Sequence, residues 1–139
     1  MEHSISQLIE KRATYIGFAI YMLLVFVIPF LLITIARIAD HELMHNYIVP
    51  FSQYKFILIV ISGLLTGMIS NNSPFVNSIY VGLLGLLIWL IFSSISTSVS
   101  GAEFSFKLIA LQCIERVSLC AAGGLCVTLY RWAVESYKH

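Results

Sequence analysis

The string His41-Glu42-Leu43-Met44-His45 has the residue types and spacing of a zinc site. On a helix, His41 and His45 lie four residues apart and share a face. Their imidazoles could therefore bind one Zn²⁺ while Glu42 polarises a bound water. A third ligand is needed, and Glu103 is the best candidate. It follows the apolar segment 75–96, which is predicted below to cross a membrane and to end on the same face as the His41–His45 string.

This string resembles the zinc-binding motif of the zincin-type metalloproteases, and the resemblance is confined to its five residues. It implies a membrane metalloprotease that uses His41, Glu42 and His45. However, the string lies in a connection outside the membrane, before Pro50, where no protein covers a catalytic cleft. We therefore expect a polar loop, no enzymatic activity and no cofactor, and keep His41, His45 and Glu103 as an alternative metal-ligand set.

A second pair of chemically capable residues, Glu115 and Arg116, interrupts a mostly apolar segment. Ionisable groups at membrane depth are costly and tend to pair. Neighbours on a helix point about 100° apart, so these two side chains must reach different partners. We expect each to pair structurally across an interface, with a counter-charge on a second copy of the chain. A segment lying on the membrane surface and an ion or proton path are the alternatives.

The composition indicates a membrane setting for these residues. The apolar set A, V, I, L, M, F, W, Y and C makes up 59% of the 139 residues, and charged residues make up 11%, against roughly 25% in soluble domains. Eight Lys and Arg balance seven Asp and Glu, which excludes the basic footprint of direct nucleic-acid binding. The three cysteines match no zinc or redox spacing and are expected to pack as small apolar residues.

The chain is predicted to be an all-α integral membrane protein with four transmembrane helices. A span requires about 20 apolar residues, and the candidates are residues 15–36, 54–70, 75–96 and 107–132, forming one domain over residues 1–139. Pro29 should kink the first span. Residues 71–74 (Asn-Asn-Ser-Pro) predict a tight turn between the second and third. Residues 4–7 (Ser-Ile-Ser-Gln) fit a capping box and predict a short N-terminal interfacial helix.

Small residues are expected to hold the helices together, because helices in lipid gain little from further hydrophobic burial. The first span has few of them and is expected to face lipid. We expect the Gly123-Gly124 face to be free of the hairpin and to form the subunit contact of a homo-oligomer, a dimer or tetramer. The candidates for helix packing or an oligomer interface are Gly63, Gly67, Gly82, Gly85, Gly123, Gly124, Glu115 and Arg116.

Basic residues near the span ends indicate the orientation. The membrane face with the two termini has four Lys or Arg residues and the opposite face has three, which favours cytoplasmic termini. We expect the membrane to be a bacterial inner membrane. The two sets are Lys11, Arg12, Arg131 and Lys138, against Arg37, Lys55 and Lys107.

These features favour a non-enzymatic membrane subunit, a scaffold, sensor or anchor that recruits a soluble partner at its termini. A small oligomeric channel or transporter is the alternative, and the metalloprotease is the second alternative. In size and layout the chain is similar to small four-helix membrane components of bacterial anti-phage defence systems, and to small colicin-type immunity and entry-exclusion proteins. That likeness implies a role in defence or immunity beside a cytosolic effector, and it transfers no residue roles.

Overall fold

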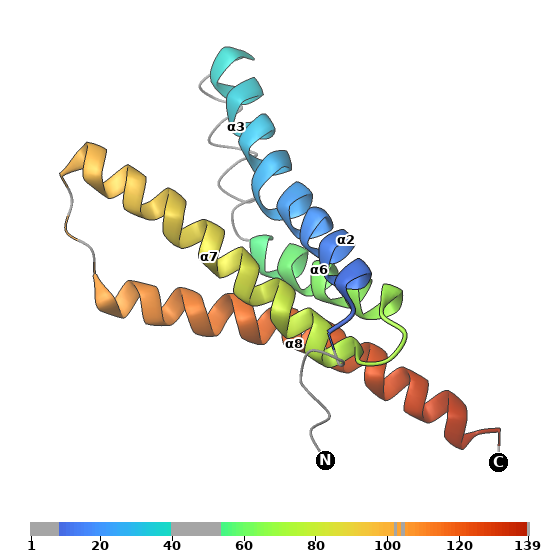
Figure 1. Cartoon of the computed structure of the whole chain (residues 1–139). Coiled ribbons are helices and arrows are strands. Elements are labelled where there is room, and N and C mark those ends of the chain that lie inside the picture. Colours follow the sequence, from blue (N-terminus) through green and yellow to red (C-terminus); the bar gives the residue numbers. More distant parts are fainter. Residues whose placement is uncertain (1–8, 40–53, 102, 104, 139) are drawn as a thin grey trace.

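The computed structural model describes residues 9–39, 54–101, 103 and 105–138, and all regular structure within these ranges is helical. The first rod consists of α2 (Lys11–Met22), a π-helical turn η1 (Leu23–Val27) and α3 (Ile28–Ala39). It is followed by α6 (Lys55–Ile69), α7 (Pro74–Ser100) and α8 (Phe106–Ser136), as Figure 1 shows. The expected interfacial helix over the capping box and the His41–His45 string lie outside the described residues.

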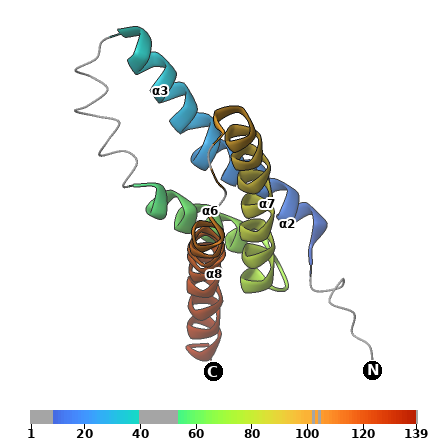
Figure 2. The same ribbon diagram turned by 90° about the vertical axis from the view of Figure 1, so that its left-hand side faces the viewer.

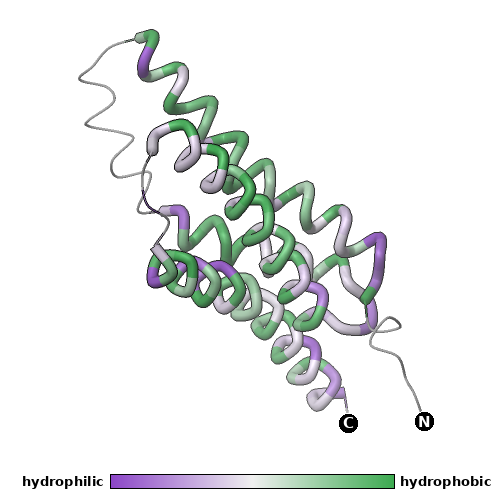
Figure 3. Tube along the Cα trace, turned by 60° about the vertical axis from the view of Figure 1, so that its left-hand side comes forward, coloured by the Kyte–Doolittle hydropathy of each residue, from purple (hydrophilic) through white to green (hydrophobic). Residues whose placement is uncertain are grey.

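Three of these helices are long and apolar enough to cross a membrane: Lys11–Ala39, Pro74–Ser100 and Phe106–Ser136. In Figure 3 the first rod and the middle of α7 are mostly hydrophobic, and α8 carries hydrophilic positions within its length as well as at its ends. The helix α6 is apolar but has only 15 residues, a length of about 22 Å against a hydrocarbon core of about 30 Å. The structure thus supports an all-α membrane fold with three candidate spans and one shorter apolar helix.

Pro29 is accommodated by the π-helical turn that ends just before it. A proline has no N–H and its ring collides with the carbonyl four residues earlier, which disrupts an α-helix. Here the helix widens over Leu23–Val27, and the N–H of Ile28 donates to the carbonyl of Leu23, five residues back. Single-turn π-bulges and prolines are both recognised positions of irregularity in long helices.

The helices α6 and α7 form the hairpin expected from the sequence. The helix α6 ends at Ile69, and α7 starts with Pro74 in its first turn, where the missing N–H costs nothing. The helix α7 ends at Gly101, whose φ of 69° is the left-handed conformation that favours glycine at a helix end. The turn after α6 and the ends of the described chain lie at one end of the bundle (Figure 1).

The helix α8 packs along both arms of this hairpin through glycines. A Cβ at Gly63 would overlap the backbone of Cys120, and a Cβ at Gly123 would overlap the backbone of Val60 in α6. A Cβ at Gly124 would overlap Ser78 of α7. The expectation that the Gly123-Gly124 face is free of the hairpin is therefore wrong: both glycines are buried against it, because only glycine allows backbones to approach so closely.

The first rod crosses the hairpin, as the side view in Figure 2 shows, and it is the least buried of the three candidate spans. In its most apolar window 11% of the residues are buried, against 33% in α7 and 28% in α8. Its contacts with the rest come mainly through α2, where Gly17 lies against Thr66 of α6. The expectation that the first helix mostly faces lipid is consistent with this burial.

Candidate functional site

Arg116 of α8 lies inside the bundle, where only 7% of its surface is exposed. Its Nη1 donates a hydrogen bond of 2.6 Å to the hydroxyl of Tyr21 in α2, and its Nε donates to the Gln112 side chain at 3.2 Å. The guanidinium carbon also lies 5.6 Å from the Phe26 ring centre and 5.7 Å from that of Trp89. Three chain segments therefore meet on one cation, through hydrogen bonds and cation–π contacts.

The backbone places these partners around the arginine. Gly85 of α7 lies against Tyr21, and a Cβ at position 85 would overlap the phenol ring. Phe26 belongs to the π-helical turn before Pro29 and stacks obliquely on Tyr21, with ring centres 6.2 Å apart. Glycine therefore makes room for the phenol, and Phe26 projects from the irregular turn beside the guanidinium.

Glu115, the neighbour of Arg116, points to a different helix. Its Oε1 lies 3.2 Å from Nζ of Lys55, the first residue of α6. The glutamate side chain is 14% exposed and the lysine side chain 41% exposed. The contact is an ion pair without hydrogen-bond alignment, since Oε1 has no hydrogen-bond donor within the described part of the chain. With Lys55 and Glu115 paired, the charge of Arg116 is not balanced by any carboxylate within the described residues.

The expectation that Glu115 and Arg116 reach different neighbours agrees with this geometry. The partners that the structure shows belong to the same chain: Lys55 of α6 for Glu115, and Tyr21 of α2 for Arg116. Pairing with a second copy was expected because adjacent charges on one helix point to different neighbours. Within the described residues, the ion pair of Glu115 and the hydrogen bonds of Arg116 are made inside one chain, and Arg116 has no carboxylate partner.

A second polar cluster fixes the start of the first rod to the hairpin turn. The Glu10 carboxylate accepts hydrogen bonds from the backbone N–H groups of Asn71, at 2.8 Å, and Asn72, and from the Ser70 hydroxyl at 3.3 Å. Burial raises the pKa of the Glu10 carboxyl, but these donors and the nearby Arg131 together lower it by more. The pKa therefore lies below its ordinary value of 4.5.

Asn77 completes this cluster from the first turns of α7, where it is fully buried. Its carbonyl oxygen accepts from the Glu10 N–H at 3.0 Å and from the Thr14 hydroxyl at 3.3 Å. Its amide donates to the Ser70 hydroxyl at 2.7 Å and to the Ser73 carbonyl at 3.0 Å. All four bonds available to an asparagine side chain are made, so Asn77 serves to lock the cluster together.

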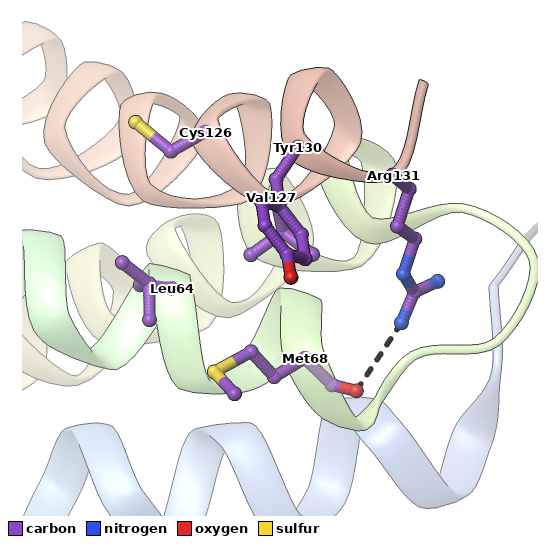
Figure 4. Close-up of a pocket in the computed structure, with 6 residues that line it drawn as sticks. All are labelled: Leu64, Met68, Cys126, Val127, Tyr130 and Arg131. Atoms are coloured by element: carbon purple, nitrogen blue, oxygen red, sulfur yellow. Dashed lines mark hydrogen bonds between the residues drawn. The ribbon is translucent and has the colours of Figure 1, made fainter. Parts of the chain in front are cut away.

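Arg131 of α8 joins the same end of the bundle. Its guanidinium donates to the carbonyls of Asn71, Gly67 and Met68, at 3.1, 3.4 and 3.3 Å. These are carbonyls at the end of α6 and in the turn that follows, which a cation stabilises. Beside this contact an apolar groove lies between α6 and α8 (Figure 4).

A cleft of about 170 Å³, smaller than the groove between α6 and α8, is lined by residues of α7, α8 and their connection. The two helices diverge toward this connection (Figure 1). Hydroxyl side chains and the carboxylate of Glu103 make up the polar lining of the cleft, and Trp89 lines it as well; Glu103 and Ser105 come from the connection. Glu103 is exposed, and the described residues hold no cluster of three metal-ligand side chains. His41 and His45 lie outside the described residues, so Glu103 is the one member of the alternative zinc set that the structure describes.

The three cysteines have different surroundings: Cys120 is buried, Cys113 is partly buried and Cys126 is exposed. Sγ of Cys120 lies 3.6 Å from the Ser62 hydroxyl, at the point where α6 and α8 cross. Cys120 thus packs as a small residue. Cys126 lies on the outer surface, in the groove beside Met68.

Sequence reasoning missed five of the residues that organise these sites. Tyr21 was passed over because one tyrosine in an apolar run carries no spacing signal. Lys55 has the sequence position of a charge that flanks a span, which gives no sign of an inward partner. Glu10, Asn77 and Arg131 were not singled out as anchors, although a carboxylate before a helix and an asparagine inside an apolar segment are signals that could have indicated them.

Comparisons of the chain with protein-family models, with curated proteins and with solved structures find no match.

Proposed function

We propose that the chain is a non-enzymatic membrane subunit that anchors, or signals to, a soluble partner on the side of its termini. In this arrangement α6 is the fourth membrane-embedded helix beside the three candidate spans, and both termini face the cytoplasm of a bacterial inner membrane. A role in bacterial defence or immunity fits this layout, by analogy of size and topology only.

The end of α8 is the observation that carries this proposal. Arg131 is the last residue of α8 with a side-chain bond to another helix, and every described residue after it is exposed. Trp132 is 68% exposed and Tyr137 is 96% exposed. This segment, residues 132–138, extends beyond the hairpin turn (Figure 1). Aromatic residues are enriched at protein–protein interfaces, so a helix end with exposed aromatic side chains is suited to bind another protein.

The use of the ionisable groups in the bundle gives further support. Arg116 is bonded to Tyr21 and Gln112, Glu115 is paired with Lys55, and Glu10 is held by the turn amides. The Arg116–Tyr21 bond and the Glu115–Lys55 pair join helices, and the Glu10 bonds join the start of α2 to the hairpin turn. Within the described ranges no two of these groups form a nucleophile and base pair. These groups therefore stabilise the bundle, and no enzymatic role follows from them.

Homo-oligomerisation remains part of the proposal, with a different surface. The glycines at the centre are occupied by contacts within the chain. The outer half of α7, with exposed Ser94, Ser98 and Ser100, diverges from α8 and carries small hydroxyl residues. Small residues favour close approach of helices in lipid, so this half of α7 is the surface we expect a second copy to contact.

Photo-crosslinking in the native cell tests the partner. A crosslinking amino acid at position 137 should give one discrete adduct with a soluble protein, and Trp132→Ala should weaken that adduct. The matched control is the same amino acid at position 95, where Ile95 is 58% exposed on α7. An adduct pattern that is the same at positions 137 and 95 would contradict the proposal.

A small oligomeric channel or transporter is the second candidate, and one observation favours it. The charge of Arg116 is unbalanced at membrane depth, and Trp89, which contacts it, also lines the cleft between α7 and α8. Ionisable groups at such depth often mark ion paths. A flux measurement in liposomes, described in the Discussion, separates the two candidates.

A further inference from the structure

A groove of about 490 Å³ runs along the outer surface between α6 and α8. Leu64 and Met68 line it from α6, and Cys126, Val127 and Tyr130 line it from α8, with Arg131 at one end (Figure 4). Met68 is 60% exposed and Tyr130 is 70% exposed. The groove therefore opens away from the bundle, toward the surroundings of the chain.

The polarity of the groove changes along its length. The helices α6 and α8 run in the same direction here, since Gly63 contacts Cys120 while Asn71 contacts Arg131. Leu64 and Cys126 lie together at one end, and Arg131 lies at the other, beside the hairpin turn (Figure 4). In a membrane, the first end lies in the hydrocarbon and the second near the headgroups.

Arg131 is able to bind an anion while it holds the end of α6. A guanidinium has five N–H donors, and the bonds to α6 and its turn come from Nη1 and Nη2 only. Glu10, the nearest carboxylate in the cluster, is bound by the Asn71 and Asn72 amides, and no ion pair joins it to Arg131 among the described residues. N–H donors of Arg131 that are not bonded to α6 or its turn therefore remain at the headgroup end.

We propose that this groove binds one anionic phospholipid. An acyl chain would lie along Leu64, Met68 and Cys126, and the phosphate would accept hydrogen bonds from Arg131. An apolar channel that ends in an arginine is complementary to a lipid tail joined to a phosphate, since a guanidinium forms charge-assisted hydrogen bonds with phosphate. The inference rests on the membrane location of the chain and is independent of the soluble partner.

Native mass spectrometry of the full chain in mild detergent tests this, with added phosphatidylglycerol or phosphatidylcholine. We expect one phosphatidylglycerol per chain, held about tenfold more tightly than phosphatidylcholine, as expected for one charge-assisted hydrogen bond. Arg131→Gln should remove this preference, and Arg131→Lys should keep part of it. Equal binding of the two lipids by the wild type would overturn the proposal.

A second variant separates lipid binding from the stability of α6. Cys126→Trp fills the groove without touching the bonds of Arg131, and should lower phosphatidylglycerol binding about tenfold at unchanged thermal stability. The matched control is Leu129→Trp, on the exposed surface of α8 outside the groove, where Leu129 is 55% exposed. Retained lipid in Cys126→Trp would refute the groove as the site. A dimer in place of the lipid adduct, lost in Cys126→Trp, would assign the groove to a second copy and also refute it.

Discussion

Arg116 donates a hydrogen bond of 2.6 Å to the hydroxyl of Tyr21, across 95 residues of the chain. The bond joins the last helix to the first inside the bundle, where the arginine is 7% exposed. Among the described residues no carboxylate shares this arginine, so the phenol, Gln112 and two aromatic rings replace the water it has lost. We infer that this contact positions the otherwise exposed first rod.

Tyr21→Phe should destabilise the protein by about 1–3 kcal/mol, because it leaves a buried charged donor without an acceptor. Denaturant unfolding in detergent micelles measures the change. The control is Tyr80→Phe, since Tyr80 is 41% exposed on α7 and makes no side-chain hydrogen bond with the described residues. A Tyr21→Phe protein as stable as the wild type would show that the bond does not stabilise the bundle.

Gly123→Ala should cost about 1–3 kcal/mol, the usual penalty of overpacking, because its Cβ would overlap the backbone of α6. The loss should appear in the unfolding of a single chain, independent of protein concentration. Ala122→Leu is the matched control, since Ala122 is the exposed neighbour on the same helix. If Gly123→Ala instead dissociated an oligomer and left the stability of the monomer unchanged, the Gly123-Gly124 face would be a subunit contact after all.

The sequence was sufficient to predict the helical class, the hairpin turn and three of the four spans, because length, apolar runs and turn residues are local signals. The helix ends agree within a few residues for α6, at Lys55–Ile69 against the expected 54–70. The sequence was also sufficient to predict that the side chains of Glu115 and Arg116 point to different neighbours, since that follows from helix geometry alone.

The sequence could not identify the partners of these groups. Tyr21 and Lys55 are far from α8 in the chain, and only the crossing of helices at Gly85 and Gly63 brings them near. The same limit applies to the Gly123-Gly124 face. A glycine pattern predicts close approach, but it does not say whether the approaching helix belongs to the same chain.

Lys55→Gln and Glu115→Gln should each destabilise the protein by about 1–2 kcal/mol, less than the 3–5 kcal/mol of a fully buried pair, because Lys55 is 41% exposed. The swap Lys55→Glu with Glu115→Lys should recover part of the loss. A double-mutant cycle on thermal unfolding gives the coupling. Additive single losses, with no recovery in the swap, would show that the ion pair contributes nothing.

The Glu10 cluster should make stability depend on acidic pH. Because the folded pKa lies below 4.5, the carboxylate stabilises the fold above about that pH, and its contribution is lost as the pH falls through the folded pKa. Thermal unfolding between neutral and acidic pH should show this loss in the wild type and a smaller one in Glu10→Gln. Identical pH profiles of the two proteins would contradict a role for this carboxylate.

The most direct measurement compares the thermal stability and the ion flux of Arg116→Gln with those of the wild type. If the buried charges hold the helices together, the wild type reconstituted in liposomes passes no more ions than protein-free liposomes. The variant should then unfold at least about 3 °C lower, while Arg37→Gln, at the exposed end of α3, unfolds like the wild type. Ion flux through the wild type that Arg116→Gln abolishes at unchanged stability would contradict this and assign Arg116 to a conduction path.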